Sequence, residues 1–184
     1  MNGFVSGSGF QYTRYDITDL STKTAAGLKA AVDSNANTIV VQETGIRAEL
    51  ESTNIYGVNY GQVFKGYFYA PVSGDYIFRG AADDTFQLYL SSNYGSAEIG
   101  ATPLISLSSY SSYADNYYVK NESSSMSAPT TLVGGKYYYM EVYHTNGVGG
   151  GFLKISVEVP NTNIELGWQS HEVNQFETAY TNDP

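Results

Sequence analysis

The chain has 184 residues, which suits one domain with a sizeable core, and its formal charge of −9 disfavours nucleic acid and anionic membranes as partners. It has no cysteine, so disulfides, thiolate metal sites and cysteine nucleophiles are excluded. The 18 tyrosines against 9 lysines and arginines are typical of an extracellular β-protein. No apolar run reaches the roughly 20 residues of a membrane-spanning helix, so direct membrane insertion is not expected.

One helix is predicted near the N-terminus, in residues 20–34 (LSTKTAAGLKAAVDS). Ala25, Leu28 and Ala31 follow helical spacing, and Ser21 or Thr22 is available as the N-cap. The interior Gly27 costs about 1 kcal/mol relative to alanine, so packing against the rest of the protein must hold this helix.

From residue 38 onward the hydrophobic pattern alternates, which predicts a series of β-strands. TIVVQET is followed by GQVFKGYFYAP, GDYIFRG and DTFQLYLSS, and residues 71–74 (PVSG) predict a hairpin between the second and third of these strands. KYYYMEVYHT and FLKISVEVP alternate in the same way. These runs predict an all-β fold, an antiparallel sandwich with one short helix.

Two segments are less regular. Residues 91–136 are rich in Ser, Tyr and Asn and predict a long, decorated insertion loop with at most one or two short strands. After Pro160 the alternation fades, although Trp168 and Phe176 suggest that the tail packs back as a strand or an extension. The prediction is one domain over residues 1–184, with residues 1–60 as an N-terminal strand and helix elaboration and residues 161–184 as the tail.

A search for catalytic motifs gives no enzyme signature, and we expect a protein that is not an enzyme. His144 and His171 are far apart without metal-motif spacing, which favours satisfied or solvated histidines. A pair of distant carboxylates for glycoside hydrolysis stays open, because sequence spacing does not test it.

The stretch GAADDTF places Asp83 and Asp84 between two strands. Neighbouring side chains of an extended backbone point to opposite faces, so by themselves these residues favour a solvated turn. Convergence on one cation requires an unusual backbone, such as a cis peptide bond. Asn146 opens a second candidate segment, residues 146–151, whose glycines allow the main chain to turn its carbonyls inward. Together the two segments offer oxygen ligands, which calcium prefers.

Two runs carry a resemblance to a known family: VFKGYFYAPVSGDYIFRGAADDTFQLYL and GKYYYMEVYHTNGVGGGFLKISVEVP. They resemble the PA14 domain, a β-sandwich named after the anthrax protective antigen and found in toxins, glycosidases, fibrocystin-like surface proteins and yeast adhesins. The resemblance is best over residues 61–160. It rests on GDYIF at residues 74–78, the paired aspartates, and LYL at residues 88–90.

In the calcium-dependent lectins of this family, consecutive aspartates joined by a cis peptide bond bind the ion together with an asparagine and two main-chain carbonyls. The resemblance therefore implies a Ca²⁺ site with side chains from Asp83, Asp84 and Asn146 and main-chain oxygens from Val148 and Gly150. Where the adhesins carry a tryptophan this chain has Gly150, which removes an apolar wall of the sugar pocket. Candidates for ligand contact are Gly149 and four tyrosines of the insertion: Tyr110, Tyr113, Tyr117 and Tyr118.

The expected function is a calcium-dependent carbohydrate-binding, lectin-like module of an extracellular or cell-surface adhesive protein, with glycans of a cell surface or matrix as partners. Such a module is expected within a larger multidomain chain. Two alternatives stay open. One is a structural protein–protein module of a surface or fibrous assembly, with calcium only structural, and the other is an accessory domain of a glycosidase or toxin.

Overall fold

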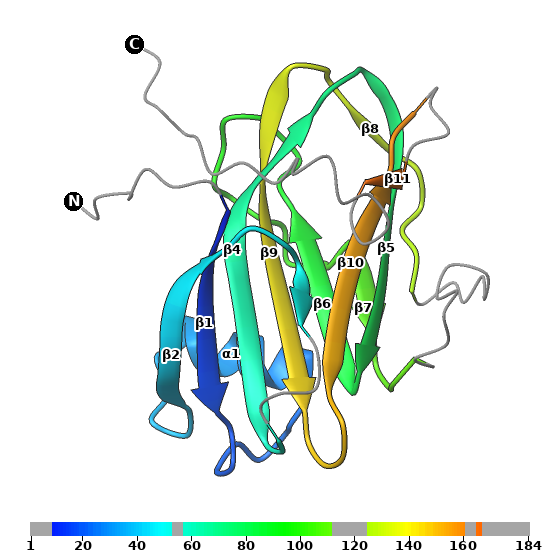
Figure 1. The fold of residues 1–184 in the computed structure, drawn as a ribbon. Helices are drawn as coiled ribbons and strands as arrows, with labels where there is room; N and C mark the ends of the chain where they lie inside the picture. Colours follow the sequence, from blue (N-terminus) through cyan, green and yellow to red (C-terminus); the bar gives the residue numbers. More distant parts are fainter. Residues whose placement is uncertain (1–8, 53–56, 112–124, 161–164, 167–184) are drawn as a thin grey trace.

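The computed structural model describes residues 9–52, 57–111, 125–160 and 165–166. In these ranges the chain forms two antiparallel sheets that face each other, with one helix outside them (Figure 1). The helix is α1 (Ala25–Asp33), and the strands are β1 (Phe10–Asp16), β2 (Val40–Arg47), β3 (Glu51–Ser52), β4 (Tyr60–Ala70), β5 (Gly74–Asp83), β6 (Thr85–Leu90), β7 (Ile105–Leu107), β8 (Thr130–Leu132), β9 (Lys136–Asn146), β10 (Phe152–Glu158) and β11 (Glu165–Leu166).

The six-stranded sheet has the order β2-β1-β4-β9-β6-β7, and the five-stranded sheet has the order β11-β10-β5-β8 with β3 also paired to β10. The predicted antiparallel sandwich and its single short helix are therefore confirmed. Strands β4 and β9 form the longest pairing of the protein, from Tyr60 opposite Asn146 to Ala70 opposite Lys136. This pairing is the centre of the six-stranded sheet.

The predicted hairpin between β4 and β5 is wrong. Both edges of β4 are already occupied, by β1 on one side and β9 on the other, and β5 pairs with β10 and β8 in the opposite sheet. The turn after Ala70 carries the chain across the sandwich instead of back along the same sheet. A turn motif predicts a reversal of direction, but it does not predict which sheet the next strand joins.

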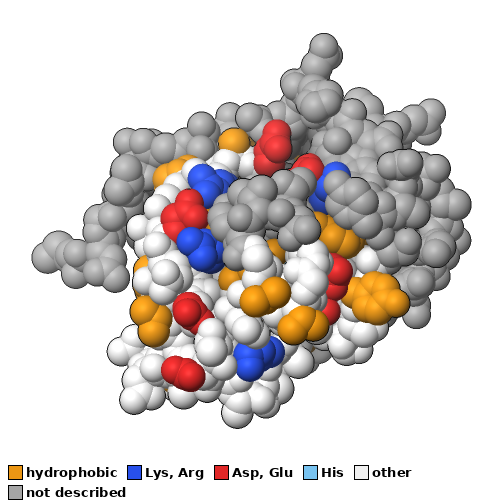
Figure 2. Space-filling view, turned by 60° about the horizontal axis from the view of Figure 1, so that its bottom comes forward, with side chains coloured by type: hydrophobic (Ala, Val, Ile, Leu, Met, Phe, Trp, Pro, Cys, Tyr) orange, Lys and Arg blue, Asp and Glu red, His pale blue; other side chains and the backbone are white. Residues whose placement is uncertain are grey.

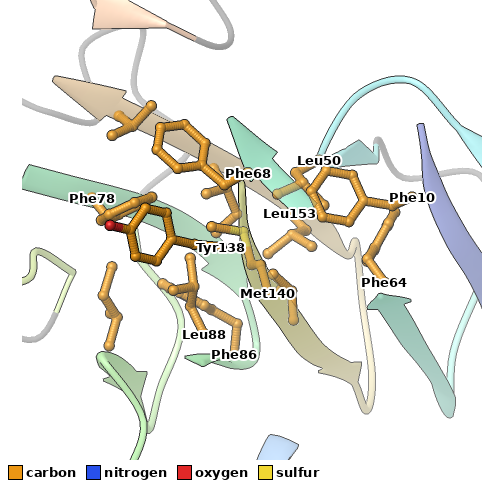
Figure 3. Close-up of a cluster of buried hydrophobic side chains, with 14 of the residues drawn as sticks. Phe10, Leu50, Phe64, Phe68, Phe78, Phe86, Leu88, Tyr138, Met140 and Leu153 are labelled. Carbon is orange, nitrogen blue, oxygen red and sulfur yellow. The ribbon is translucent and has the colours of Figure 1, made fainter. Parts of the chain in front are cut away.

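The main core lies between the two sheets and is rich in aromatic rings (Figure 3). Phe68 is fully buried at its centre and packs edge-on against Tyr76 and Phe78, with ring centroids 5.6 and 5.2 Å apart. Alternating residues of each strand face this layer, as the period of two predicted. Its members include Phe10, Leu50, Phe64, Phe86, Leu88, Tyr138, Met140 and Leu153.

A second cluster lies on the outer face of the six-stranded sheet, where α1 covers β4, β6 and β9. Leu28 of the helix packs here with Val63 and Tyr143. The N-cap is Thr24, whose Oγ1 accepts a hydrogen bond from the Gly27 amide at 3.1 Å, so the predicted caps Ser21 and Thr22 are wrong. The Ala25 amide donates to Thr85 Oγ1 at 2.7 Å, and this tertiary contact fixes where the helix begins.

The described residues of the insertion contain two short strands, β7 and β8, within the number predicted. Beyond Pro160, β11 pairs with β10, while Trp168 and Phe176 lie outside the described residues. In the described part of the chain no helix has the length and apolar character that crossing a membrane requires.

The aromatic core generates a stability prediction. Phe68→Ala should lower the free energy of unfolding by about 3–5 kcal/mol, because it removes a buried ring and leaves a cavity between the sheets. Val41→Ala, at a side chain that is 55 % exposed on β2, is the matched control and should change stability by at most about 0.5 kcal/mol. Chemical denaturation checks both variants, and equal effects would contradict this description of the core.

Candidate functional site

The site is built at one end of the sandwich, where β5 passes into β6 (Figure 1). Asp83 ends β5, Thr85 begins β6, and the peptide bond between Asp83 and Asp84 is cis, as the resemblance implied. We call residues 83–85 the aspartate corner. The connection from β9 to β10 lies at the same end, and its residues 147–151 are called the glycine loop. Figure 2 shows acidic, basic and hydrophobic side chains interspersed on the surface at this end.

Sheet register brings the aspartate corner and the glycine loop together despite some sixty intervening residues. Thr85 pairs with Thr145 in one sheet, and Asp83 pairs with Phe152 in the other. The Asp84 amide donates to the Thr145 carbonyl at 2.9 Å, and the Gly147 amide donates to Asp84 Oδ2 at 2.7 Å. A Cβ on Gly147 would lie 3.2 Å from that carboxylate oxygen, so a glycine allows the close approach.

Asn146 ends β9 and is fully buried. Its Nδ2 donates to the carbonyls of Gly57, at 2.8 Å, and Gly149, at 3.4 Å. These two bonds fix the orientation of the amide. Its Oδ1 is buried and has no hydrogen-bond donor among the described residues. A buried acceptor without a partner costs about 1–3 kcal/mol, so this oxygen is positioned to accept a cation or another donor.

The two carboxylates of the aspartate corner face each other. Burial, and then the neighbouring Asp84 carboxylate, raise the pKa of Asp83 to about 6 from an ordinary value of 3.8. A raised pKa means that the charged form of Asp83 is disfavoured in the folded protein. A bound cation would reverse this effect, because it would stabilise both negative charges.

His144 contacts the aspartate corner from the interior of the protein. Its Nε2 donates to the Asp83 carbonyl at 2.8 Å, Nδ1 lies 2.9 Å from Gln62 Oε1, and Tyr60 packs edge-on against the ring. Burial lowers its pKa to about 4, so the ring is neutral at pH 7 and adds no positive charge beside the carboxylates. Of the two predicted alternatives, satisfied or solvated, the solvated one is wrong, because His144 is fully buried. Its contact with Asp83 was not predicted. The alternation of β9 could have predicted that His144 is buried. Tyr138, Met140 and Val142 face the core, and His144 is the next residue on the same face of the strand.

The remaining predicted residues fall into two groups. Val148 is 78 % exposed, Gly149 adopts φ 86° and Gly150 is exposed, so all three lie in the surface part of the glycine loop next to Asn146. Tyr110 is 68 % exposed and directly precedes Ser111, which hydrogen-bonds Ala82 beside the aspartate corner. The other predicted contacts, Tyr113, Tyr117 and Tyr118, lie outside the described residues.

The donor set is made of oxygen atoms. Among the described residues, no three side chains of His, Asp or Glu gather as a metal cluster. The aspartate corner contributes two carboxylates, and the glycine loop side contributes the Asn146 amide oxygen and exposed main chain. Calcium accepts amide and carbonyl oxygens as readily as carboxylates, whereas zinc prefers histidine and cysteine. The residues present therefore fit calcium.

A comparison with protein families shows the family to which the chain belongs. The family model of the PA14 domain matches residues 8–178. The chain belongs to the PA14 domain family. The resemblance inferred from the sequence is thereby confirmed. No curated protein sequence matches the chain.

Solved structures with this fold include adhesin domains. The epithelial adhesin 6 A domain of Candida glabrata, in complex with Galβ1-3GlcNAc, matches with a TM-score of 0.63 and 11 % identity, over 100 % of this chain and 96 % of that one. The PA14 domain of the antifreeze protein MpAFP matches at 0.61 and 14 %, over 91 % and 92 %. A PA14 sugar-binding domain from an RTX adhesin matches at 0.61 and 12 %, over 88 % and 96 %. At these identities the likeness shows a shared fold.

The raised pKa of Asp83 predicts a pH-dependent effect of its replacement. Its folded-state pKa lies above the ordinary value, so its stabilising contribution is present below about pH 4 and lost as pH rises through 6. In chelator at pH 7.5, Asp83→Asn should therefore raise the unfolding temperature of this PA14 domain by roughly 2–4 °C. At pH 4.5 the same variant should differ little from the wild type.

Thermal unfolding by circular dichroism at the two pH values makes this comparison. Asp19→Asn, at an exposed position outside the aspartate corner and the glycine loop, is the control and should change neither value. A loss of stability in Asp83→Asn at pH 7.5 would contradict the electrostatic description of the corner.

Proposed function

We propose that this PA14 domain is a calcium-dependent carbohydrate-binding module. The observation that carries the proposal is the buried Asn146 Oδ1, which has no hydrogen-bond donor among the described residues. It belongs to the residue directly before Gly147, whose amide donates to the Asp84 carboxylate. Removing an acceptor from water without a partner is unfavourable, and so is placing two carboxylates side by side. One cation bound to all three groups would offset both costs.

In this proposal Asp83, Asp84 and Asn146 hold calcium through their side chains, and Val148 and Gly150 supply main-chain oxygens. Calcium takes six to eight oxygen ligands, so this set leaves room for exchangeable ones. Two adjacent hydroxyls of a sugar can occupy such positions in place of water at modest cost. The ion would then connect the protein to its ligand directly.

The ligand class is supported by the neighbours in fold. The Candida glabrata adhesin domain was solved with a disaccharide, and the RTX adhesin domain is described as sugar-binding. We extend the sugar class, without a specific sugar, to this chain on the basis of its own oxygen cluster. A role in binding without catalysis, outside the cell or on its surface, accords with these adhesins and with the tyrosine-rich composition.

The loop position at which the adhesins carry tryptophan is occupied here by the exposed Gly150. Because the contact expected there is a main-chain carbonyl, calcium binding does not require the tryptophan ring. The sugar, however, loses one apolar wall on that side. Affinity for a single sugar is expected to be micromolar to millimolar, strengthened where several copies act together.

Calorimetry tests the metal half of the proposal. Calcium titrated into chelator-treated protein at pH 7.5, where Asp83 is ionised, should bind at one site. Asp84→Asn and Asn146→Ala should each weaken the affinity on the order of 100-fold, because they remove a ligand charge or a ligand oxygen. Asp19→Asn is the matched control and should bind as the wild type does.

A glycan array tests the carbohydrate half with the same proteins. The wild type should bind glycans in calcium and lose that binding in excess chelator, and Asp84→Asn should bind none. Calcium binding without any glycan binding would favour a structural module in which the ion only stabilises the fold. Glycan binding that persists in chelator would contradict the proposal.

A further inference from the structure

Tyr110 is a large aromatic side chain held at the surface close to the aspartate corner. The residue after it, Ser111, is clamped to the end of β5. The Ser111 amide donates to the Ala82 carbonyl at 2.8 Å, and the Ala82 amide donates to Ser111 Oγ at 3.0 Å. The backbone next to Tyr110 is therefore fixed, while the Tyr110 side chain is 68 % exposed.

The two ends of the short segment that contains Tyr110 are both held near the aspartate corner. At one end, Leu107 of β7 pairs with Phe86, two residues after Asp84. At the other end, Ser111 bonds Ala82, two residues before Asp84. Tyr110 therefore lies in a three-residue connection between these two points, at the end of the sandwich that carries the corner.

The glycine loop lies on the opposite side of β5. Strand β10 pairs with β5 along the edge opposite β8, and Phe152 of β10 lies opposite Asp83. The glycine loop immediately precedes Phe152. A Cβ placed on Gly149 would meet no atom within 4 Å, so the space beside this glycine is open. The two sides therefore differ: the glycine loop has the small Val148 side chain among its glycines, and the other side carries an exposed aromatic ring.

Tyr110 also differs from the other strongly exposed tyrosine of the described residues. Tyr94 is 52 % exposed, but Lys136 Nζ lies over its ring at 5.0 Å from the centroid. No ring or cation of the described residues packs on Tyr110 in this way. Exposed aromatic surface is costly to leave in water, and an aromatic face is well suited to the apolar C–H face of a sugar ring.

We propose that Tyr110 is the apolar wall of the ligand site, on the side of Asp83 opposite the glycine loop. Its ring stacks on the C–H face of a pyranose whose adjacent hydroxyls bind the calcium ion. This inference rests on the proposed function. The apolar wall that is missing at Gly150 would have been on the other side of the corner. The ligand class is therefore cyclic sugars with adjacent hydroxyls and an uninterrupted C–H face.

The test compares Tyr110→Ala and Tyr110→Phe with the wild type on the same glycan array in calcium, over a dilution series of protein. Tyr110→Ala should need about tenfold more protein for half-maximal binding to every glycan that the wild type binds. Tyr110→Phe should stay within about twofold, because it keeps the ring. Tyr94→Ala is the matched control and should bind as the wild type does.

Calcium affinity, measured by calorimetry in the same variants, separates the two proposals. It should be unchanged in Tyr110→Ala, because that side chain contributes no ligand to the ion. Glycan binding by Tyr110→Ala at the wild-type level would overturn the role of Tyr110 and leave the proposed function intact. If the wild type binds calcium but no glycan on the array, the proposed function fails, and the role of Tyr110 fails with it.

Discussion

The hydrogen bond from the Gly147 amide to the Asp84 carboxylate is the contact on which the site depends. It joins the chain that leaves β5 to the chain that leaves β9, and the bond from the Asp84 amide to the Thr145 carbonyl backs it. Because β5 and β9 belong to different sheets, these bonds also close one end of the sandwich. The same contacts place Asp84 next to Gly147 and Thr145, the two chain neighbours of Asn146.

Two further groups hold that corner in place. His144, neutral and buried, donates to the Asp83 carbonyl, while Thr85 accepts from the first amide of α1. Thr85 and Thr145 are also joined through their hydroxyls at 2.8 Å. The corner is therefore fixed from the core and from the helix, and residues 148–150 of the glycine loop are exposed beside it. A rigid support with an open face is what a binding site requires.

The strands, the sandwich and α1 could be predicted from local patterns, because alternation and helical spacing report which residues are buried. Two local details could not. The N-cap is Thr24 because of a contact with Thr85, and β5 leaves the β4 sheet because both edges of β4 are taken. Grouping the aspartates with Asn146 rested on the glycine-rich segment that Asn146 opens and then on the family resemblance, since neighbouring side chains ordinarily diverge. The unpartnered Asn146 Oδ1 and the placement of Tyr110 depend on register across the sheets, which no short motif encodes.

The central claim is that Asp83, Asp84 and Asn146 Oδ1 share one calcium ion. Crystals grown in calcium chloride, with anomalous diffraction data, test it most directly. We predict a single anomalous peak at about 2.3–2.6 Å from the carboxylate oxygens of both aspartates and from Asn146 Oδ1. A map without a peak at the aspartate corner, or one in which Asn146 Oδ1 accepts a hydrogen bond from a protein group, would contradict this account.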